Sequence, residues 1–199
     1  MHKLNRLCVF CGSNDGAKKE YAEAAHQLAE VMYANRIGLV YGGATIGLMG
    51  KIADSLLKLG GEVIGVIPSF LLEKEIAHED VTELHIVNSM HERKTLMADM
   101  SDGFVMMPGG GGTFEEFFEI FTWNQLGLIK KPYGILNVEN YFDLLVSFLD
   151  HAVSEKFVPP LARSLMIVQE TPQQLIASFM GYEKPSDAAL QERPVIQSV

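Results

Sequence analysis

Short apolar runs alternate with longer amphipathic segments along most of the chain. The runs at residues 64–67 and 104–107 contain only apolar residues and glycine, as strands buried on both faces require. Residues 18–36 instead place Tyr21, Leu28 and Met32 on one stripe at helical spacing. Strands are expected at residues 7–11, 37–41, 62–67, 84–87, 104–107, 133–138 and 165–168, helices at 18–36, 48–59, 89–101, 113–126, 141–156 and 172–180, and a polar, irregular stretch at 69–83.

This alternation predicts an α/β protein built as a single doubly wound, Rossmann-like domain. We expect a mostly parallel sheet of about seven strands with helices on both faces. The domain is expected to span residues 1–181. Residues 182–199 lose the periodicity and are expected to form a disordered tail.

Composition and charge narrow the class of protein further. The 199 residues are 48% hydrophobic, and they contain neither a run long enough for a membrane span nor a signal-peptide pattern, so a cytoplasmic protein is expected. The net charge of −9 argues against nucleic-acid or anionic-membrane partners. It leaves room for a phosphate-bearing small molecule, because backbone N–H groups can hold an anion locally.

The two cysteines, Cys8 and Cys11, form a C-x-x-C pattern that could indicate a redox pair or half of a zinc site. Residues three apart on a strand point to opposite faces, and a second pair of zinc ligands is missing. We therefore expect a buried strand here, and no metal site.

Three expected strands end in small or glycine-rich loops that precede helices. These loops are Gly12-Ser13, the segment 42–47 and the segment 108–112. In doubly wound folds the ligand lies beyond the carboxyl ends of the strands, where helix N-termini favour a phosphate. Ser13 and Gly43 are accordingly candidate ligand contacts.

The loop motifs of two large nucleotide-binding classes are absent. The Gly-Lys pair at Gly50 and Lys51 has Thr45 where the first glycine of a Walker A loop belongs. The dinucleotide pattern G-x-G-x-x-G fails because the run that starts at Gly110 ends in Glu115. An ordinary nucleoside triphosphatase and a standard NAD enzyme are both excluded.

Four successive glycines, Gly109–Gly112, follow Pro108. Such a run costs backbone entropy and packs no side chains, but it lets a ligand approach the main chain and lets N–H groups form an anion nest. The alternative is a flexible turn without a ligand.

Glu116 admits two interpretations. Thr113 and Glu116 match a capping box, in which Thr113 is the N-cap. Alternatively, Glu116 lies at the flank of a helix whose core face carries the phenylalanines, where its carboxylate could reach a ligand. The sequence leaves both open.

The segment from Met90 to Lys94 also admits two interpretations. It could be a solvated helix start, or Arg93 could supply a guanidinium for a phosphate or hydroxyl groups, with Lys94 as a second cation. His91 has no neighbours that would make it a catalyst.

These motifs resemble those of the LOG (Lonely Guy) family, the cytokinin riboside 5′-monophosphate phosphoribohydrolases that are often labelled lysine decarboxylases. Residues 108–116 resemble its P-G-G-x-G-T-x-x-E signature, and residues 90–94 its M-H-x-R-K motif. The loops at 11–13 and 42–50 are also similar to those of the family. The similarity extends from about Leu7 to Phe179, and Gly111 occupies the variable position of the signature.

The resemblance implies N-glycosidic cleavage of an adenosine 5′-monophosphate, modified at N6 or not, with no cofactor, in a homodimer or larger assembly. It implies that Arg93 and Glu116 are catalytic. The implied substrate contacts are Glu75, Lys94, Gly110, Gly111, Gly112, Thr113, Phe114, Glu115 and Thr122. The competing hypotheses are a nucleotide or cofactor carrier on the same fold, which would have no use for a carboxylate beside its anion, and a decarboxylase, for which no suitable lysine context exists.

Overall fold

The computed structural model describes residues 3–72 and 77–186, and its elements alternate as the sequence predicts. The strands are β1 (Arg6–Phe10), β2 (Gly38–Tyr41), β3 (Val63–Pro68), β4 (Glu83–Val87), β5 (Gly103–Met106), β6 (Tyr133–Leu136) and β7 (Met166–Gln169). The helices are α1 (Lys19–Ala34), α2 (Gly47–Leu59), α4 (Met90–Asp99), α5 (Gly111–Gln125), α6 (Asp143–Ser154), α7 (Pro160–Leu165) and α8 (Pro172–Met180), with short 3-10 turns η1 (Ser69–Leu71) and η2 (Val138–Asn140).

The seven strands form one sheet in the order β4-β3-β2-β1-β5-β6-β7. Every neighbouring pair is parallel, which confirms the predicted doubly wound α/β fold. The chain builds outward from β1 to β4 and then returns to the other side of β1 with β5. The loops that follow β1 and β5 therefore leave the sheet in opposite directions, and this divergence opens a crevice at the carboxyl edge.

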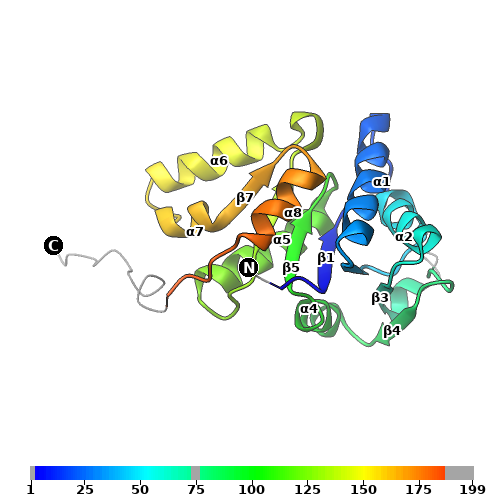
Figure 1. Ribbon diagram of the computed structural model, residues 1–199. Coiled ribbons are helices and arrows are strands. Elements are labelled where there is room, and N and C mark those ends of the chain that lie inside the picture. Colours follow the sequence, from blue (N-terminus) through cyan, green and yellow to red (C-terminus); the bar gives the residue numbers. More distant parts are fainter. Residues whose placement is uncertain (1–2, 73–76, 187–199) are drawn as a thin grey trace.

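Helices cover both faces of the sheet (Figure 1). One core cluster joins the sheet to α1, α2 and α8 and contains Leu28, Ile52 and Phe179. The other contains Met97 of α4 and Phe117 of α5, together with residues of α6 and α7. The strand residues of both clusters are almost completely buried, so the carboxyl edge of the sheet is a rigid platform for the loops above it.

Cys8 and Cys11 are buried free thiols on opposite sides of the sheet. Cys8 belongs to the core cluster with α4 and α5, whereas Cys11 belongs to the cluster with α1 and α2. Burial raises the pKa of both thiols above the ordinary range. The expectation of a buried strand is therefore confirmed, and a redox or zinc role for this pair has no support.

The connection around β6 differs most from the sequence prediction. β6 ends at Leu136, before the expected end at residue 138, because the Asn137 side chain accepts a hydrogen bond from the Phe142 N–H (2.8 Å) and donates one to Asp143 (2.7 Å). Glu139 and Asn140 are left-handed, with φ of 52° and 58°, so α6 begins at Asp143 rather than at residue 141. α7, a single short helix, was not predicted.

The last helix in the described part of the chain is α8. α8 ends at Met180 as predicted, and part of the expected tail, residues 187–199, lies outside the described residues. Within residues 3–72 and 77–186, none of the helices has the length and apolar character needed to cross a membrane.

Candidate active site

A cavity of about 590 Å³ lies at the carboxyl edge of the sheet, in the crevice between the loops after β1 and β5. Its lining includes the expected residues Ser13, Arg93, Gly110, Gly111, Gly112, Thr113, Glu115 and Glu116. The two motifs that the sequence separates by some twenty residues, around Arg93 and Glu116, therefore meet in one cavity.

Gly12 connects three of the loops that border the cavity. Its N–H donates a hydrogen bond to the Pro108 carbonyl, and its own carbonyl accepts one from the Leu48 N–H, both at 3.0 Å. A Cβ atom on Gly12 would lie 3.0 Å from the Asn14 oxygen and 3.3 Å from Gly109 Cα. Gly12 is therefore required by close packing, and it fixes the loops after β1, β2 and β5 relative to one another.

The glycines Gly110, Gly111 and Gly112 are not required by the packing of the chain itself. A Cβ atom on any of them would have no heavy atom of another part of the chain within 4 Å, and none has a left-handed backbone. Gly109 differs, because a Cβ there would overlap Thr113 and approach the Gly12 nitrogen to 2.9 Å. The open space over three successive glycines at the start of α5 is what a closely bound anion needs.

The capping-box interpretation of Thr113 and Glu116 is wrong. α5 begins at Gly111, and its N-cap is Gly110, so Thr113 is the third residue of the helix and is buried. Sequence reasoning placed the start two residues late because glycines are poor helix formers. The helix starts inside the glycine run, and Glu116 does not cap it.

Arg93 is a buried arginine with a fixed guanidinium. Nε donates to the Val66 carbonyl and Nη2 to the Gly42 carbonyl, each at 3.1 Å, at the carboxyl ends of β3 and β2. Nη1 lies 3.9 Å from Oε1 of Glu116, whose side chain is 12% exposed. The sheet holds the side of the guanidinium formed by Nε and Nη2, and Nη1 is the group directed to Glu116.

Lys94 points to the outer side of α5. Its Nζ contacts Oε1 of Glu115 at 2.5 Å and Oε2 of Glu119 at 3.1 Å. Burial is the largest single influence and lowers the pKa of Lys94, but the hydrogen bonds to the two glutamates and their charges outweigh it, so the pKa is raised overall. Lys94 does not line the cavity, although its partner Glu115 does.

The polar start of α4 contains both residues that cap the helix and a residue that faces the cavity, so each interpretation of its sequence applies to part of it. Ser89 caps the helix by accepting a hydrogen bond from the Glu92 N–H (3.1 Å), and Glu92 accepts one from the Asn88 N–H (2.8 Å). This arrangement resembles a capping box. The helix start is thus structural at Ser89 and Glu92, while Arg93, one residue later, faces the cavity.

Besides Lys94, four expected substrate contacts do not line the cavity or lie outside the described residues. Gly43 is buried beneath it, with a φ of +78° and a carbonyl that accepts the His78 N–H at 2.9 Å. Phe114 packs against the core, and Thr122 is exposed on α5, where its hydroxyl donates to the Phe118 carbonyl. Glu75 lies outside the described residues.

The side walls of the cavity were missed by the sequence analysis. Met49, Leu71 and Met90 supply apolar surface, and Tyr21 and Tyr141 supply two aromatic rings, 5.6 Å apart and edge to face. In the sequence, the spacing of Tyr21 indicated only a helix residue that faces the core. Tyr141 follows a strand. Its position at the carboxyl edge of the sheet was the one feature of the sequence that could have indicated a place in the cavity wall.

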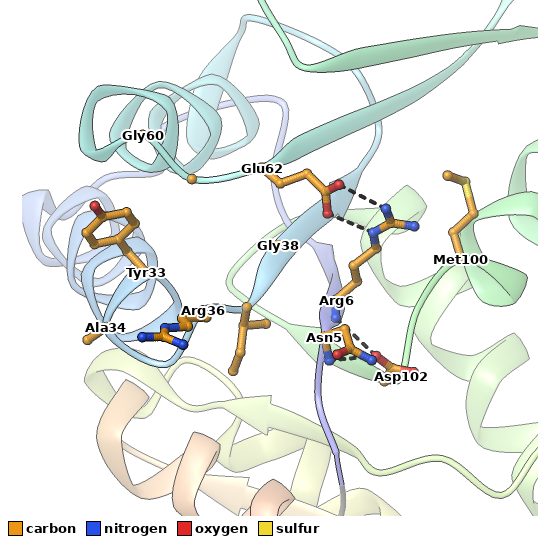
Figure 2. A pocket seen from close by; sticks show the side chains of 12 residues that line it. Asn5, Arg6, Tyr33, Ala34, Arg36, Gly38, Gly60, Glu62, Met100 and Asp102 are labelled. Atoms are coloured by element: carbon orange, nitrogen blue, oxygen red, sulfur yellow. Dashed lines mark hydrogen bonds and ion pairs between the residues drawn. The ribbon is translucent and has the colours of Figure 1, made fainter.

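A second cavity, of about 840 Å³, lies at the opposite, amino edge of the sheet (Figure 2). There Glu62 pairs with Arg6 at 2.7 Å, and Asp102 accepts hydrogen bonds from the backbone N–H groups of Asn5 and Arg6. The C-terminal ends of α1, α2 and α4 border this cavity, so they present carbonyls rather than N–H groups. A phosphate fits the cavity at the carboxyl edge better.

A parallel sheet wound in both directions from β1, with a glycine loop and a helix N-terminus at the switch point, defines a Rossmann-like α/β protein. The model of the family described as "possible lysine decarboxylase" matches residues 49–179. Among solved structures, the molybdenum cofactor binding protein of Rippkaea orientalis has a TM-score of 0.67 at 20% identity, covering 91% of this chain and 98% of that one. The Moco carrier protein of Chlamydomonas reinhardtii has a TM-score of 0.66 at 18% identity, covering 90% and 97%. At such identities these structures show the fold alone.

Relatives identified by their sequence have a much higher identity to this chain. The probable cytokinin riboside 5′-monophosphate phosphoribohydrolase LOGL6 of Oryza sativa subsp. japonica is 45% identical over 93% of this chain and 74% of its own. The cytokinin riboside 5′-monophosphate phosphoribohydrolases LOG7 and LOG1 of Arabidopsis thaliana are 43% and 46% identical, covering 93% and 90% of this chain and 85% and 84% of their own. The chain belongs to the LOG family of cytokinin riboside 5′-monophosphate phosphoribohydrolases.

Proposed function

We propose that this protein hydrolyses the N-glycosidic bond of an adenosine 5′-monophosphate, including N6-modified forms, and releases the free base and ribose 5-phosphate. Relatives that are 43% to 46% identical to it over the aligned residues carry the name of this activity. The observation that carries the proposal is the pairing, in one cavity, of an open glycine loop with Arg93 and Glu116. The loop suits the phosphate, and the pair suits the bond to be cleaved.

The phosphate would bind over the glycine loop. The first N–H groups of α5 have no partners within the helix, and the helix dipole favours negative charge at this end. The absence of side chains at Gly110, Gly111 and Gly112 leaves the space that the phosphate oxygens would occupy. Ser13 borders the same cavity from the loop after β1. Binding energy at the phosphate would then position C1′ of the ribose, the reacting atom on the other side of the sugar ring.

Glu116 would act at the ribose. Cleavage breaks the C1′–N bond, the electron pair leaves with the base, and positive charge develops on the sugar. A carboxylate beside C1′ stabilises that charge and can accept the proton of the water whose oxygen bonds to C1′. Arg93 places a positive charge next to the carboxylate, while its Nε and Nη2 remain bonded to backbone carbonyls. It would keep Glu116 in place near a phosphate that would otherwise repel it.

We further propose that the protein works as a homodimer or larger assembly, in the cytoplasm. Lys94 and Thr122 lie outside the cavity of their own chain, so their expected substrate contacts would require a second protomer. The exposed Leu126 and Leu128 at the end of α5, 56% and 68% exposed, offer apolar surface for it. The two free thiols accord with a reducing compartment. Light scattering of the purified protein measures the assembly directly.

The test of the activity is release of free base. Purified protein is incubated with AMP, isopentenyl-AMP and adenosine, and the base is followed by chromatography beside the Glu116→Gln variant. We expect release from the monophosphates, little from adenosine, and a loss of at least about 100-fold in the variant. Tight nucleotide binding without any release would favour a non-catalytic carrier, the function named for the proteins of similar fold. Equal rates on AMP and adenosine would contradict the phosphate site.

A further inference from the structure

The loop after β6 reaches across to the glycine loop through one tyrosine. The Tyr141 hydroxyl donates a hydrogen bond to the Gly109 carbonyl at 2.7 Å, although the two residues are 32 positions apart. Tyr141 also lines the cavity and is 42% exposed. It therefore lies where it can affect a bound ligand through the main chain of the loop.

Because the peptide bond is planar, this hydrogen bond also determines the orientation of the next N–H group in the loop. In a planar trans peptide, the carbonyl of one residue and the N–H of the next point in opposite directions. By holding the Gly109 carbonyl, Tyr141 fixes the plane of the peptide that Gly109 shares with Gly110, and so fixes the direction of the Gly110 N–H. Gly110 and the two glycines after it have no side chains with which to hold that plane.

The position of Tyr141 is itself strongly constrained. The two residues before it, Glu139 and Asn140, both adopt left-handed backbone conformations, which are unfavourable for residues other than glycine. Glu139 is also paired with Lys18 of the loop before α1 at 3.1 Å. The Tyr141 ring packs edge to face against Phe142, with centroids 4.8 Å apart. A strained turn held from several sides is typical of a segment that positions a functional group.

We propose that Tyr141 is a positioning residue that sets the anion-binding conformation of the glycine loop. It aims the Gly110 N–H at the ligand by holding the Gly109 carbonyl from behind. This inference rests on the proposed phosphate site, and it identifies a residue outside both motifs that determines how much the 5′-phosphate contributes to binding. Tyr141 acts on the ligand through the loop, whereas Arg93 and Glu116 act at the ribose.

The test is Tyr141→Phe, which keeps the ring packing and removes only the hydroxyl. Affinities for AMP, adenosine and ribose 5-phosphate are measured by calorimetry, with AMP measured in the Glu116→Gln background so that no turnover interferes. A lost hydrogen bond of typical strength predicts an AMP and ribose 5-phosphate affinity about five- to tenfold weaker. Adenosine affinity should be unchanged, and in turnover KM should rise while kcat changes little.

Tyr133→Phe is the matched control. Its hydroxyl donates to the Ala162 carbonyl at 2.9 Å in the core, away from the loop. It should lower the melting temperature and leave the AMP affinity unchanged. Equal AMP affinity in Tyr141→Phe and the parent would overturn the positioning role, whether or not the protein hydrolyses AMP. Weaker AMP binding in a protein that releases no base would support the positioning role and reject only the hydrolase.

Discussion

Nη1 of Arg93 lies 3.9 Å from Oε1 of Glu116, too far for a direct hydrogen bond, while Nε and Nη2 are held at 3.1 Å by carbonyls of β3 and the loop after β2. The guanidinium is thus anchored to the sheet and only approaches the carboxylate. The charge of Glu116 is offset by a neighbour, but its oxygens are not tied to that neighbour by a short contact. Under the proposed function, Glu116 would act on a sugar and a water molecule with the positive charge of Arg93 beside it.

Replacing Arg93 with lysine should damage both stability and turnover. Lysine cannot reproduce the planar fork, so at least one of the Val66 and Gly42 carbonyls loses its donor, at a cost of about 2 kcal/mol. For a chain of this size we expect a fall in melting temperature of about 4–8 °C and a fall in kcat of about 100-fold. Arg163→Lys, at an ion pair with Asp150 on α7 and α6, is the control. Near-normal turnover by Arg93→Lys would show that the fork is dispensable.

Gly42→Ala should impair catalysis although glycine has no functional group. A methyl group there would overlap Nη2 of Arg93 and lie 2.9 Å from the Met49 sulfur, so the guanidinium has to move. We expect kcat/KM to fall at least about tenfold, with the 1–3 kcal/mol destabilisation typical of overpacking. Gly103→Ala overpacks Leu7 (2.9 Å) at the amino edge and should lose stability alone. Kinetic constants for Gly42→Ala that match those of Gly103→Ala would remove the link to Arg93.

Gly111→Ala should separate binding from stability. The position is free of contacts and lies in the first turn of α5, so alanine should keep or raise the melting temperature, by analogy with exchanges worth about 0.4–1 kcal/mol. The same methyl group would occupy space reserved for the phosphate, and KM for AMP should rise at least about tenfold. Gly181→Ala, after α8, serves as the control for stability, because a Cβ there would make only ordinary contacts with the Ala177 and Ser178 carbonyl oxygens, at 3.6 and 3.7 Å. Unchanged KM in Gly111→Ala would favour a turn without a ligand.

The Arg6–Glu62 pair predicts a specific dependence of stability on pH. The hydrogen bond from Arg6 is the main cause that lowers the pKa of Glu62 below its ordinary value of 4.5. A lowered folded-state pKa stabilises the protein above pH 4.5, and this contribution is lost as the pH falls through the lower folded value. The pair is partly exposed, so Glu62→Gln should cost less than about 1 kcal/mol at pH 7 and less still at pH 3. Denaturant unfolding at both pH values measures this, with Glu30→Gln as the control. A cost that grows towards pH 3 would contradict the assignment.

The fold was predictable because the strands are apolar throughout and the helices have clear periodicity. β3 and β5 are fully buried, and such runs admit few other interpretations. The left-handed pair Glu139 and Asn140 was not predictable, because neither residue is a glycine and the turn is held by the side chain of Asn137 and by that of Lys18, which is far away in the sequence. The short α7 lacks enough turns to produce a periodic signal.

The parts of the site that consist of sequence motifs were predictable. The parts that depend on tertiary contacts were not. The meeting of Arg93 with the glycine loop follows from parallel strands whose carboxyl ends share one edge. The anchoring of Arg93 on Val66 and Gly42 depends on the side-by-side packing of β2 and β3 beneath α4, which no local pattern records. The same is true of the bond between Tyr141 and Gly109.

The anchoring of Arg93 on sheet carbonyls has a consequence for how the protein can diversify. Val66 and Gly42 hold the Arg93 guanidinium through their carbonyls at the edge of the sheet, whereas Leu71 on η1 and Tyr21 on α1 border other parts of the cavity. Substitutions at those two positions would change the shape of the cavity and leave both carbonyl anchors of Arg93 in place. Under the proposed function, the preference for one base over another could therefore change during evolution while the anchoring of Arg93 is retained.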